Sequence, residues 1–387
     1  MKKFLWGIPL IIVLGIVIAN SFISNDKKNV TINVYNWGEF ISDGTDGLLD
    51  VNKEFTQRTG IKVNYSTFQS NEALFAKLEN GGTKYDVIIP SDYMISKLIE
   101  KNMLKKLDFN CIPNFSLINQ EFKNPIYDPL NEYSVPYVWG TVSLIYNKRF
   151  VDVKEEDVSW NLLFDPKYKG KILMFDNPRD AFSIAQFKLG LDVNSKNMSE
   201  WRLALNELKN QKSLVQAYVM DQIFDKMGNE EAFLAPYYTG DAINLMKKNP
   251  NIGVAIPREG TNKFVDAMCV PKDSEHPMEA YMYINFMCEK DVAIANVLHI
   301  GYSTPEKAVQ ESLELTEEEK NLNYPDKEIL DKTQTFKNLS DNISDKLENL
   351  WVFVKIGKVG NNLILVIILS VFLLVYLILF IIRKYKK

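Results

Sequence analysis

The 387-residue chain has few of the residues that build metal sites and nucleophiles. It contains three cysteines, Cys111, Cys269 and Cys288, and two histidines, His276 and His299, without a CxxC pair. This scarcity argues against a zinc or iron site built from Cys and His. Three scattered cysteines are more typical of buried thiols than of a disulfide with a reactive thiol beside it.

The short motifs of common enzymes are also absent. The sequence has no GxSxG, HExxH, P-loop or GxGxxG pattern, which would mark a nucleophile, a metal-bound base or a phosphate cradle. Among enzymes, the remaining alternative is a hydrolase that uses a pair of acids. Its acids would lie beside a polar face that binds water, whereas those described below accompany aromatic side chains. We therefore expect a binding protein, not an enzyme, without a cofactor.

The two ends of the chain are basic, whereas the part between them has a net negative charge. The net charge is −4, and six basic residues lie in the ends, which leaves −10 for residues 4–382. An acidic domain suits a cationic partner and argues against nucleic acid. Excess acid also keeps a domain soluble, so charge alone does not decide between these interpretations.

Two apolar runs stand near the ends. Residues 363–382 carry no charge over 20 positions and precede a basic tail, and such a run spans the roughly 30 Å hydrocarbon layer. Residues 4–19 resemble a signal peptide or a signal anchor, and the anchor is favoured because no good cleavage pattern follows. We expect N- and C-terminal transmembrane helices, with the ligand-binding domain on the extracytoplasmic face of the cell membrane.

Between these runs, short strands alternate with helices. The first part is predicted as strands at 31–37, 61–68 and 85–91 and helices at 47–60, 71–82 and 93–104. Such an order predicts a mostly parallel sheet with helices on both faces. Residues 133–148 and 251–273 are extended segments that enclose a second α/β set, and 279–298 is predicted to be helical.

Two α/β lobes joined by two crossing segments form a clamshell. The predicted organisation is an N-terminal segment at 1–27, lobe 1 at 28–141 and 266–310, lobe 2 at 142–265 and 311–355, a spacer at 356–362, a transmembrane helix at 363–382 and a cytoplasmic tail at 383–387.

Aromatic and acidic side chains gather at the predicted strand-to-helix turns, where open parallel sheets bind ligands. A linear polyamine fits them, because its ammonium groups need carboxylates and its methylene chain needs flat apolar walls that also attract cations. A sugar site would carry more amides and fewer acids, and a metal site would bring the acids to one point. The candidate ligand-binding residues are Trp37, Glu39, Phe40, Ser91, Tyr93, Asp180, Tyr238, Asp241, Phe264, Asp266 and Tyr302.

Several of these residues have a purely structural interpretation as well. Asp180 and Asp241 are each expected either to cap a helix or to bind the ligand. Asp266 stands inside an apolar strand, where a carboxylate needs a partner, and this favours ligand contact. Asp92 and Asp176, like Glu39, are expected at the rim or at helix caps.

The motifs YNWGEF, YDVIIPSDYMISKL, YSVPYVWGT, TGDA, FVDAMCVP and IGYSTP occur in this order. Through these motifs, residues 30–330 resemble the spermidine/putrescine-binding proteins that feed ABC transporters, which are members of the larger class of periplasmic binding proteins. The resemblance implies the two-lobed periplasmic-binding-protein clamshell with two crossover segments. The resemblance implies an aromatic box, a small polar contact at Ser91, amine-binding acids at Asp180 and Asp266, and an acid at Asp241 typical of the putrescine-preferring branch. Asn177 stands where the spermidine branch has an aspartate, so the choice between putrescine and spermidine stays open.

The expected function is therefore capture of spermidine or putrescine by a membrane-tethered monomer, and delivery to the permease subunits of an ABC transporter. One alternative is a sensor that reports polyamines through a membrane partner. Another keeps the fold but binds a different cationic amine or an amino acid.

Overall fold

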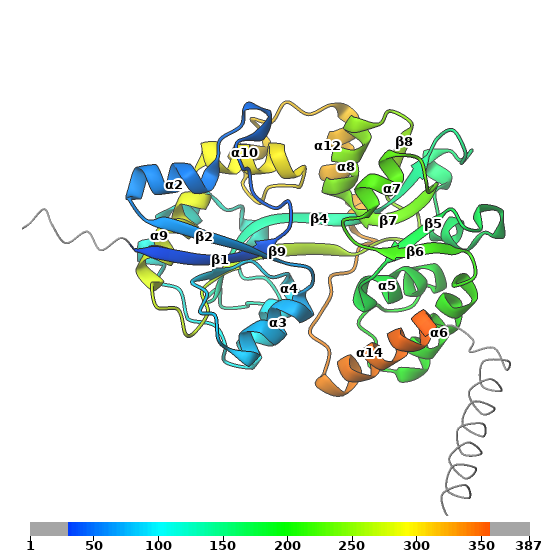
Figure 1. Ribbon diagram of the computed structural model, residues 1–387, viewed down its shortest axis with the longest axis horizontal. Coiled ribbons are helices and arrows are strands. Elements are labelled where there is room, and N and C mark those ends of the chain that lie inside the picture. The colour runs from blue at the N-terminus through cyan, green and yellow to red at the C-terminus, as the bar shows by residue number, and fades with distance from the viewer. Residues whose placement is uncertain (1–29, 357–387) are drawn as a thin grey trace, which may run out of the picture. The chain divides into compact units, whose positions relative to one another are not determined.

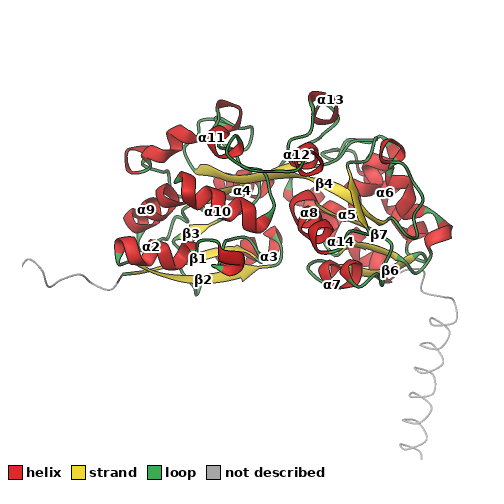
Figure 2. Cartoon of the chain, turned by 90° about the horizontal axis from the view of Figure 1, so that it is seen from above, coloured by secondary structure: helices red, strands yellow, loops and turns green. Residues whose placement is uncertain are grey.

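The computed structural model describes residues 30–356, which divide into two compact units (Figure 1). Each unit contains both strands and helices (Figure 2). The chain passes between the units within two strands, β4 (Ser134–Asn147) and β9 (Lys263–Cys269), and again after residues 300, 303 and 312. Among the described residues, unit 1 holds 30–137, Asp266–Ile300 and Thr304–Ser312, and unit 2 holds Val138–Val265, Gly301–Ser303 and 313–356.

Unit 1 is built on parallel strands. β1 pairs with β2 over seven residues, from Thr31 opposite Lys62 to Trp37 opposite Phe68, and with β3 on its other side. β9 joins β3 in the antiparallel direction. Helices α2 and α10 cover one face of these strands, and α3 and α4 cover the other (Figure 1). The elements are β1 Thr31–Trp37, α2 Val51–Thr59, β2 Lys62–Phe68, α3 Asn71–Asn80, β3 Val87–Ile88, α4 Asp92–Glu100, α9 Pro277–Met287, α10 Lys290–Ile300 and α11 Lys307–Gln310.

Unit 2 has a mixed sheet. Its strands follow the order β4-β7-β5-β6, with β8 also paired to β4. The β5 strand is parallel to β6 and β7, whereas β4 is antiparallel to β7. The elements are β5 Ile172–Phe175, α5 Pro178–Leu189, α6 Met198–Gln211, β6 Val215–Val219, α7 Ile223–Gly228, β7 Leu234–Tyr238, α8 Thr239–Lys248, β8 Ile252–Ala255, α12 Glu317–Asn323, α13 Lys327–Leu330 and α14 Asp341–Ile356.

Local sequence explains where several helices begin and end. Asp50 and Ser70 accept hydrogen bonds from backbone N–H groups in the first turns of α2 and α3, which satisfies donors that a helix start leaves open. Gly60 ends α2 with φ 77°, a left-handed conformation that glycine adopts without steric cost. The predicted strands and helices of the first part therefore form, with ends that differ by a few residues.

Two predicted strands are shorter than expected, because proline and glycine residues interrupt them. The run 85–91 forms only the two-residue strand β3, because Pro90 cannot donate to a ladder and Ser91 already precedes α4. The extended run 251–273 breaks into β8 and β9. Between them lie Pro257 and Gly260, the latter with φ 97°.

The prediction that transmembrane helices belong to the fold is wrong. No helix among residues 30–356 is long and apolar enough to cross a membrane. The last described helix, α14, has 16 residues, fewer than the roughly 20 that a span needs, and it is amphipathic. The apolar runs 4–19 and 363–382, from which the spans were predicted, lie outside the described residues.

Candidate functional site

The candidate residues form two sets, one in each unit. The unit 1 set comprises Trp37, Glu39, Phe40, Ser91, Tyr93 and Asp266, and the unit 2 set comprises Asp180, Tyr238, Asp241, Phe264 and Tyr302. Each set is described within its own unit. Both contain aromatic rings, hydroxyl groups and carboxylates.

The turn after β1 presents the first members of the unit 1 set. The Trp37 ring lies 4.4 Å from the ring of Phe68 on the neighbouring strand, and its buried indole N–H has no hydrogen-bond partner. Glu39 follows with φ 51°, an uncommon left-handed conformation for a residue with a side chain, and is exposed. Phe40 is buried against Tyr137, whose hydroxyl donates to the Phe40 carbonyl. The turn is therefore held at its start by the contact of Trp37 with Phe68 and at its end by the contacts of Phe40 with Tyr137.

A carboxylate and two hydroxyls form the polar part of the unit 1 set. Ser91 Oγ donates to Asp266 Oδ1 over 2.6 Å, and this use leaves α4 without a side-chain cap from Ser91. Asp266 is only 3% exposed on β9, as its place in an apolar strand predicted. Tyr93 in the first turn of α4 donates to Glu72 over 2.9 Å. The carboxylates of Asp266 and Glu72 are thus both bonded to the start of α4, through Ser91 and Tyr93.

Asp92 and Asp176 occupy different surroundings. Asp92 is 1% exposed in the first turn of α4, where the positive end of the helix dipole stabilises a carboxylate. It accepts a hydrogen bond from the Tyr93 N–H and is not at a solvent-exposed rim. Asp176 forms a partly exposed ion pair with Lys355 of α14, 2.8 Å away.

In unit 2, Asp180 is a buried acid that does not cap its helix. Asn177 is the N-cap of α5 and accepts hydrogen bonds from the N–H groups of Arg179 and Asp180. The Asp180 carboxylate instead accepts from the Tyr238 hydroxyl over 3.0 Å. Tyr238 ends β7, so a strand end and a helix start place this hydroxyl–carboxylate pair.

Asp241 makes the second such pair. It lies in the first turn of α8, whose N-cap is Tyr238, and accepts from the Tyr302 hydroxyl over 2.7 Å. A side chain on Gly240 would overlap the Tyr302 ring, so this close approach requires glycine. Burial first, and then the negative charge of Asp241, raise the pKa of the Tyr302 hydroxyl well above its usual value. Tyr302 therefore stays protonated and remains the donor.

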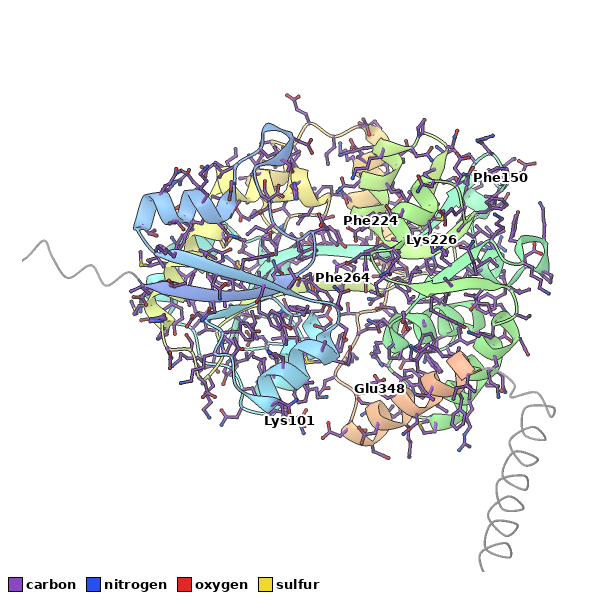
Figure 3. The ribbon with its side chains drawn as sticks, viewed as in Figure 1. Lys101, Phe150, Phe224, Lys226, Phe264 and Glu348 are labelled. Carbon is purple, nitrogen blue, oxygen red and sulfur yellow. The ribbon has the colours of Figure 1, made fainter. Side chains whose placement is uncertain are left out.

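Three aromatic rings of the unit 2 set follow one another. Phe264 on β9, labelled in Figure 3, lies 5.4 Å from the ring of Tyr238 and 6.0 Å from that of Tyr302, both in edge-to-face arrangements. Edge-to-face packing is a favourable geometry for aromatic quadrupoles. The rings carry two hydroxyls that already donate to carboxylates. The arrangement can bind a cation with an apolar chain.

Sequence reasoning missed two residues that belong with the unit 1 set. Asn71 and Glu72 begin α3, and their side chains reach Ser91 and Tyr93. The available signal was a polar pair directly after the Ser70 cap of a predicted helix. Such residues are common at helix starts, so the pattern did not distinguish a site residue from a helix-starting one.

These features define the class of a solute-binding protein: two α/β units, each with acceptor groups and aromatic rings, and no catalytic motif in the sequence. The chain belongs to the bacterial extracellular solute-binding protein family, whose model matches residues 51–323. The predicted class, a binding protein outside the cytoplasm rather than an enzyme, is confirmed.

Known proteins resemble the chain over most of its length. It is 34% identical over 331 residues to the spermidine/putrescine-binding periplasmic protein of Escherichia coli K12, which covers 85% of this chain and 92% of that protein. The structure described as a spermidine/putrescine ABC transporter from Listeria monocytogenes has a TM-score of 0.78 at 34% identity and covers 84% of this chain and 98% of that one.

A second solved structure agrees. The spermidine/putrescine substrate-binding protein PotD of Streptococcus pneumoniae has a TM-score of 0.71 at 33% identity, with 84% of this chain and 99% of that chain covered. The predicted resemblance to this family and the two-lobed α/β fold are thereby confirmed.

Proposed function

We propose that the chain captures spermidine or putrescine outside the cytoplasm and delivers it, as a monomer, to the permease subunits of an ABC transporter. The observation that carries this proposal is a repeated pairing of a hydroxyl with a carboxylate. Between residues of the two candidate sets, a hydroxyl donates to a carboxylate three times: Ser91 to Asp266, Tyr238 to Asp180 and Tyr302 to Asp241. The names of the relatives, which include spermidine/putrescine-binding proteins, support the same ligand class.

The roles follow from chemistry. Asp180, Asp241 and Asp266 bind ammonium groups, because a cation taken out of water needs a charged partner. Each set offers flat apolar walls to a methylene chain, through the rings of Trp37, Phe40 and Tyr93 in unit 1 and of Tyr238, Phe264 and Tyr302 in unit 2. Each ring adds about 0.5–2 kcal/mol where it faces a cation. Ser91 supplies a small polar contact and Glu39 an exposed carboxylate.

Calorimetric titration of the full-length chain with putrescine, spermidine and spermine tests the ligand class. We expect one-to-one binding of at least one of them, and the tightest ligand identifies what Asn177 and Asp241 select. Asp180→Asn and Asp266→Asn keep the side-chain size but remove the charge, and each should weaken binding more than about tenfold. No binding by folded wild-type protein, or unchanged affinity in both variants, would contradict the proposal.

Delivery is tested separately by uptake of labelled putrescine into cells that produce the chain and its transporter. Uptake should fall when wild-type protein is replaced by Asp266→Asn. Binding without any effect on uptake would favour a sensor instead.

A further inference from the structure

A buried asparagine at the start of α3 connects the polar members of the unit 1 set. Asn71 is 3% exposed, and burying an amide is costly unless it is hydrogen-bonded. Its Oδ1 accepts from the Ser91 N–H over 3.1 Å. Its Nδ2 donates to Ser91 Oγ and to Tyr93 Oη, each 3.1 Å away. One side chain thus holds one backbone group and two hydroxyls of α4.

Helix capping does not account for this side chain. The N-cap of α3 is Ser70, whose hydroxyl accepts from the Ala73 N–H over 3.1 Å. All the hydrogen bonds of the Asn71 side chain given above go to α4, 20 or 22 positions further along the chain. Its placement therefore serves Ser91 and Tyr93 rather than α3.

The directions of these hydrogen bonds follow from one fixed donor. The Ser91 N–H can only donate, so the amide oxygen of Asn71 must face it and the amide N–H groups must face the two hydroxyls. Each hydroxyl oxygen then accepts from Asn71 and passes its own proton on. Ser91 donates to Asp266 over 2.6 Å, and Tyr93 donates to Glu72 over 2.9 Å.

We propose that Asn71 is a positioning residue that makes this part of the unit 1 set an acceptor of hydrogen bonds only, and so a selector for ammonium groups over hydroxyl groups. The inference rests on the polyamine-binding function proposed above. With both hydroxyl protons committed to carboxylates, Ser91, Tyr93, Glu72 and Asp266 offer only lone pairs to a ligand. An ammonium group carries three donors and no acceptor, whereas a hydroxyl oxygen brings its own lone pairs against these acceptors.

Glu72 gains a role from the same geometry. It is a second carboxylate of this group, linked through Tyr93 to the amide that also orients Ser91 beside Asp266. Two carboxylates, each of which accepts a hydrogen bond from an oriented hydroxyl, strengthen the preference for a cation over a neutral group of the same size.

The test compares putrescine with 4-amino-1-butanol, in which a hydroxyl replaces one amine of the same chain. Dissociation constants of both ligands are measured by calorimetry for full-length wild-type protein and for Asn71→Leu. Without the amide, only the carboxylates of Asp266 and Glu72 orient the hydroxyls of Ser91 and Tyr93. Each hydroxyl then turns more readily to donate to the ligand oxygen. We expect the preference for putrescine over the amino alcohol to fall about tenfold in the variant. A merely structural role would weaken both ligands by the same factor and leave the ratio unchanged.

Two further variants make the result decisive. Asn71→Ala serves if leucine prevents folding, since alanine fits wherever asparagine does, and thermal unfolding followed by circular dichroism identifies folded samples. Asn64→Leu is the matched control, because Asn64 lies exposed on β2 and bonds Asn33. An unchanged ratio in folded Asn71 variants would overturn the inference alone. Failure of wild-type protein to bind any of putrescine, spermidine and spermine would overturn the polyamine function and this inference with it.

Discussion

At the scale of single residues, hydroxyl–carboxylate pairing is the recurring device of both sets. Tyr302 and Tyr238 each direct their proton to an acid on the first turn of a helix, Asp241 and Asp180. A hydroxyl that donates to a carboxylate holds the acid in one orientation without neutralising it, so the negative charge stays available to a cation. The sequence named these residues as candidates for the ligand site, but it did not show which hydroxyl donates to which acid.

A buried acid outside both sets gives a prediction of pH dependence. Glu306 precedes α11, is 5% exposed and makes no side-chain cap, and burial raises its pKa to about 7. Because the folded state holds this proton more tightly than the unfolded state, stability should fall as the pH rises from about 4.5 to 7. Glu306→Gln should therefore be more stable than wild type by about 3 kcal/mol at pH 8 and no different near pH 4.

Urea unfolding at several pH values measures this difference. Glu311→Gln is the matched control, since Glu311 is exposed in the same segment, and it should stay within about 0.5 kcal/mol of wild type. A pH-independent effect of Glu306→Gln would contradict the assignment.

At the scale of elements, the sheets follow from local patterns, and the exceptions have local causes. Strand β1 has the predicted bounds, 31–37, because alternating side chains and the Gly38 turn specify it. Helix α14 was assigned to lobe 2 without being recognised as a helix. Its buried residues recur on one side of the helix, and it packs against α5 and α6 of unit 2 (Figure 1).

The packing of α14 predicts a large effect from one residue. Trp351 is 4% exposed, and its ring lies 5.2 Å from that of Tyr218 and 6.4 Å from that of Phe182. Trp351→Ala should lower the free energy of unfolding by about 3–5 kcal/mol, because it removes buried apolar surface and leaves a cavity. Phe353→Ala on the same helix is the control, since Phe353 is 57% exposed and should cost little. Calorimetric melting that shifts equally for both variants would contradict this packing.

At the scale of the whole molecule, charge and family agree. Residues 4–382 carry a net charge of −10, and relatives are named for binding spermidine and putrescine, which are cations. An acidic protein attracts a cation over several ångströms, and salt screens the attraction within a Debye length of roughly 10 Å at 0.1 M. We therefore expect the net charge to affect how fast the proposed polyamine ligand associates with the chain.

The expected result is a salt-dependent association rate for the proposed polyamine ligand. Stopped-flow tryptophan fluorescence with spermidine should show a slower association rate at 0.5 M than at 0.05 M sodium chloride, by several-fold. Glycerol at matched osmolality is the control, since it carries no charge and changes the viscosity little, and it should lower the rate much less than the salt does. A rate that does not respond to salt would show that steering by net charge plays no part.

The sequence by itself determined the α/β class, most strands and helices, the acidic charge and the residue types of the two sets. These depend on short-range periodicity, glycine and proline positions, and composition, all of which a linear chain displays. Only the tertiary structure showed that Asn177 rather than Asp180 caps α5, that Asp92 is buried, and that Asn71 and Glu72 join Ser91 and Tyr93. The hydrogen bonds of Asn71 and Glu72 link residues 20 to 22 positions apart, so packing rather than local pattern decides their partners. Packing likewise decides that Asp92 is buried and that the Asp180 carboxylate faces Tyr238 instead of capping α5.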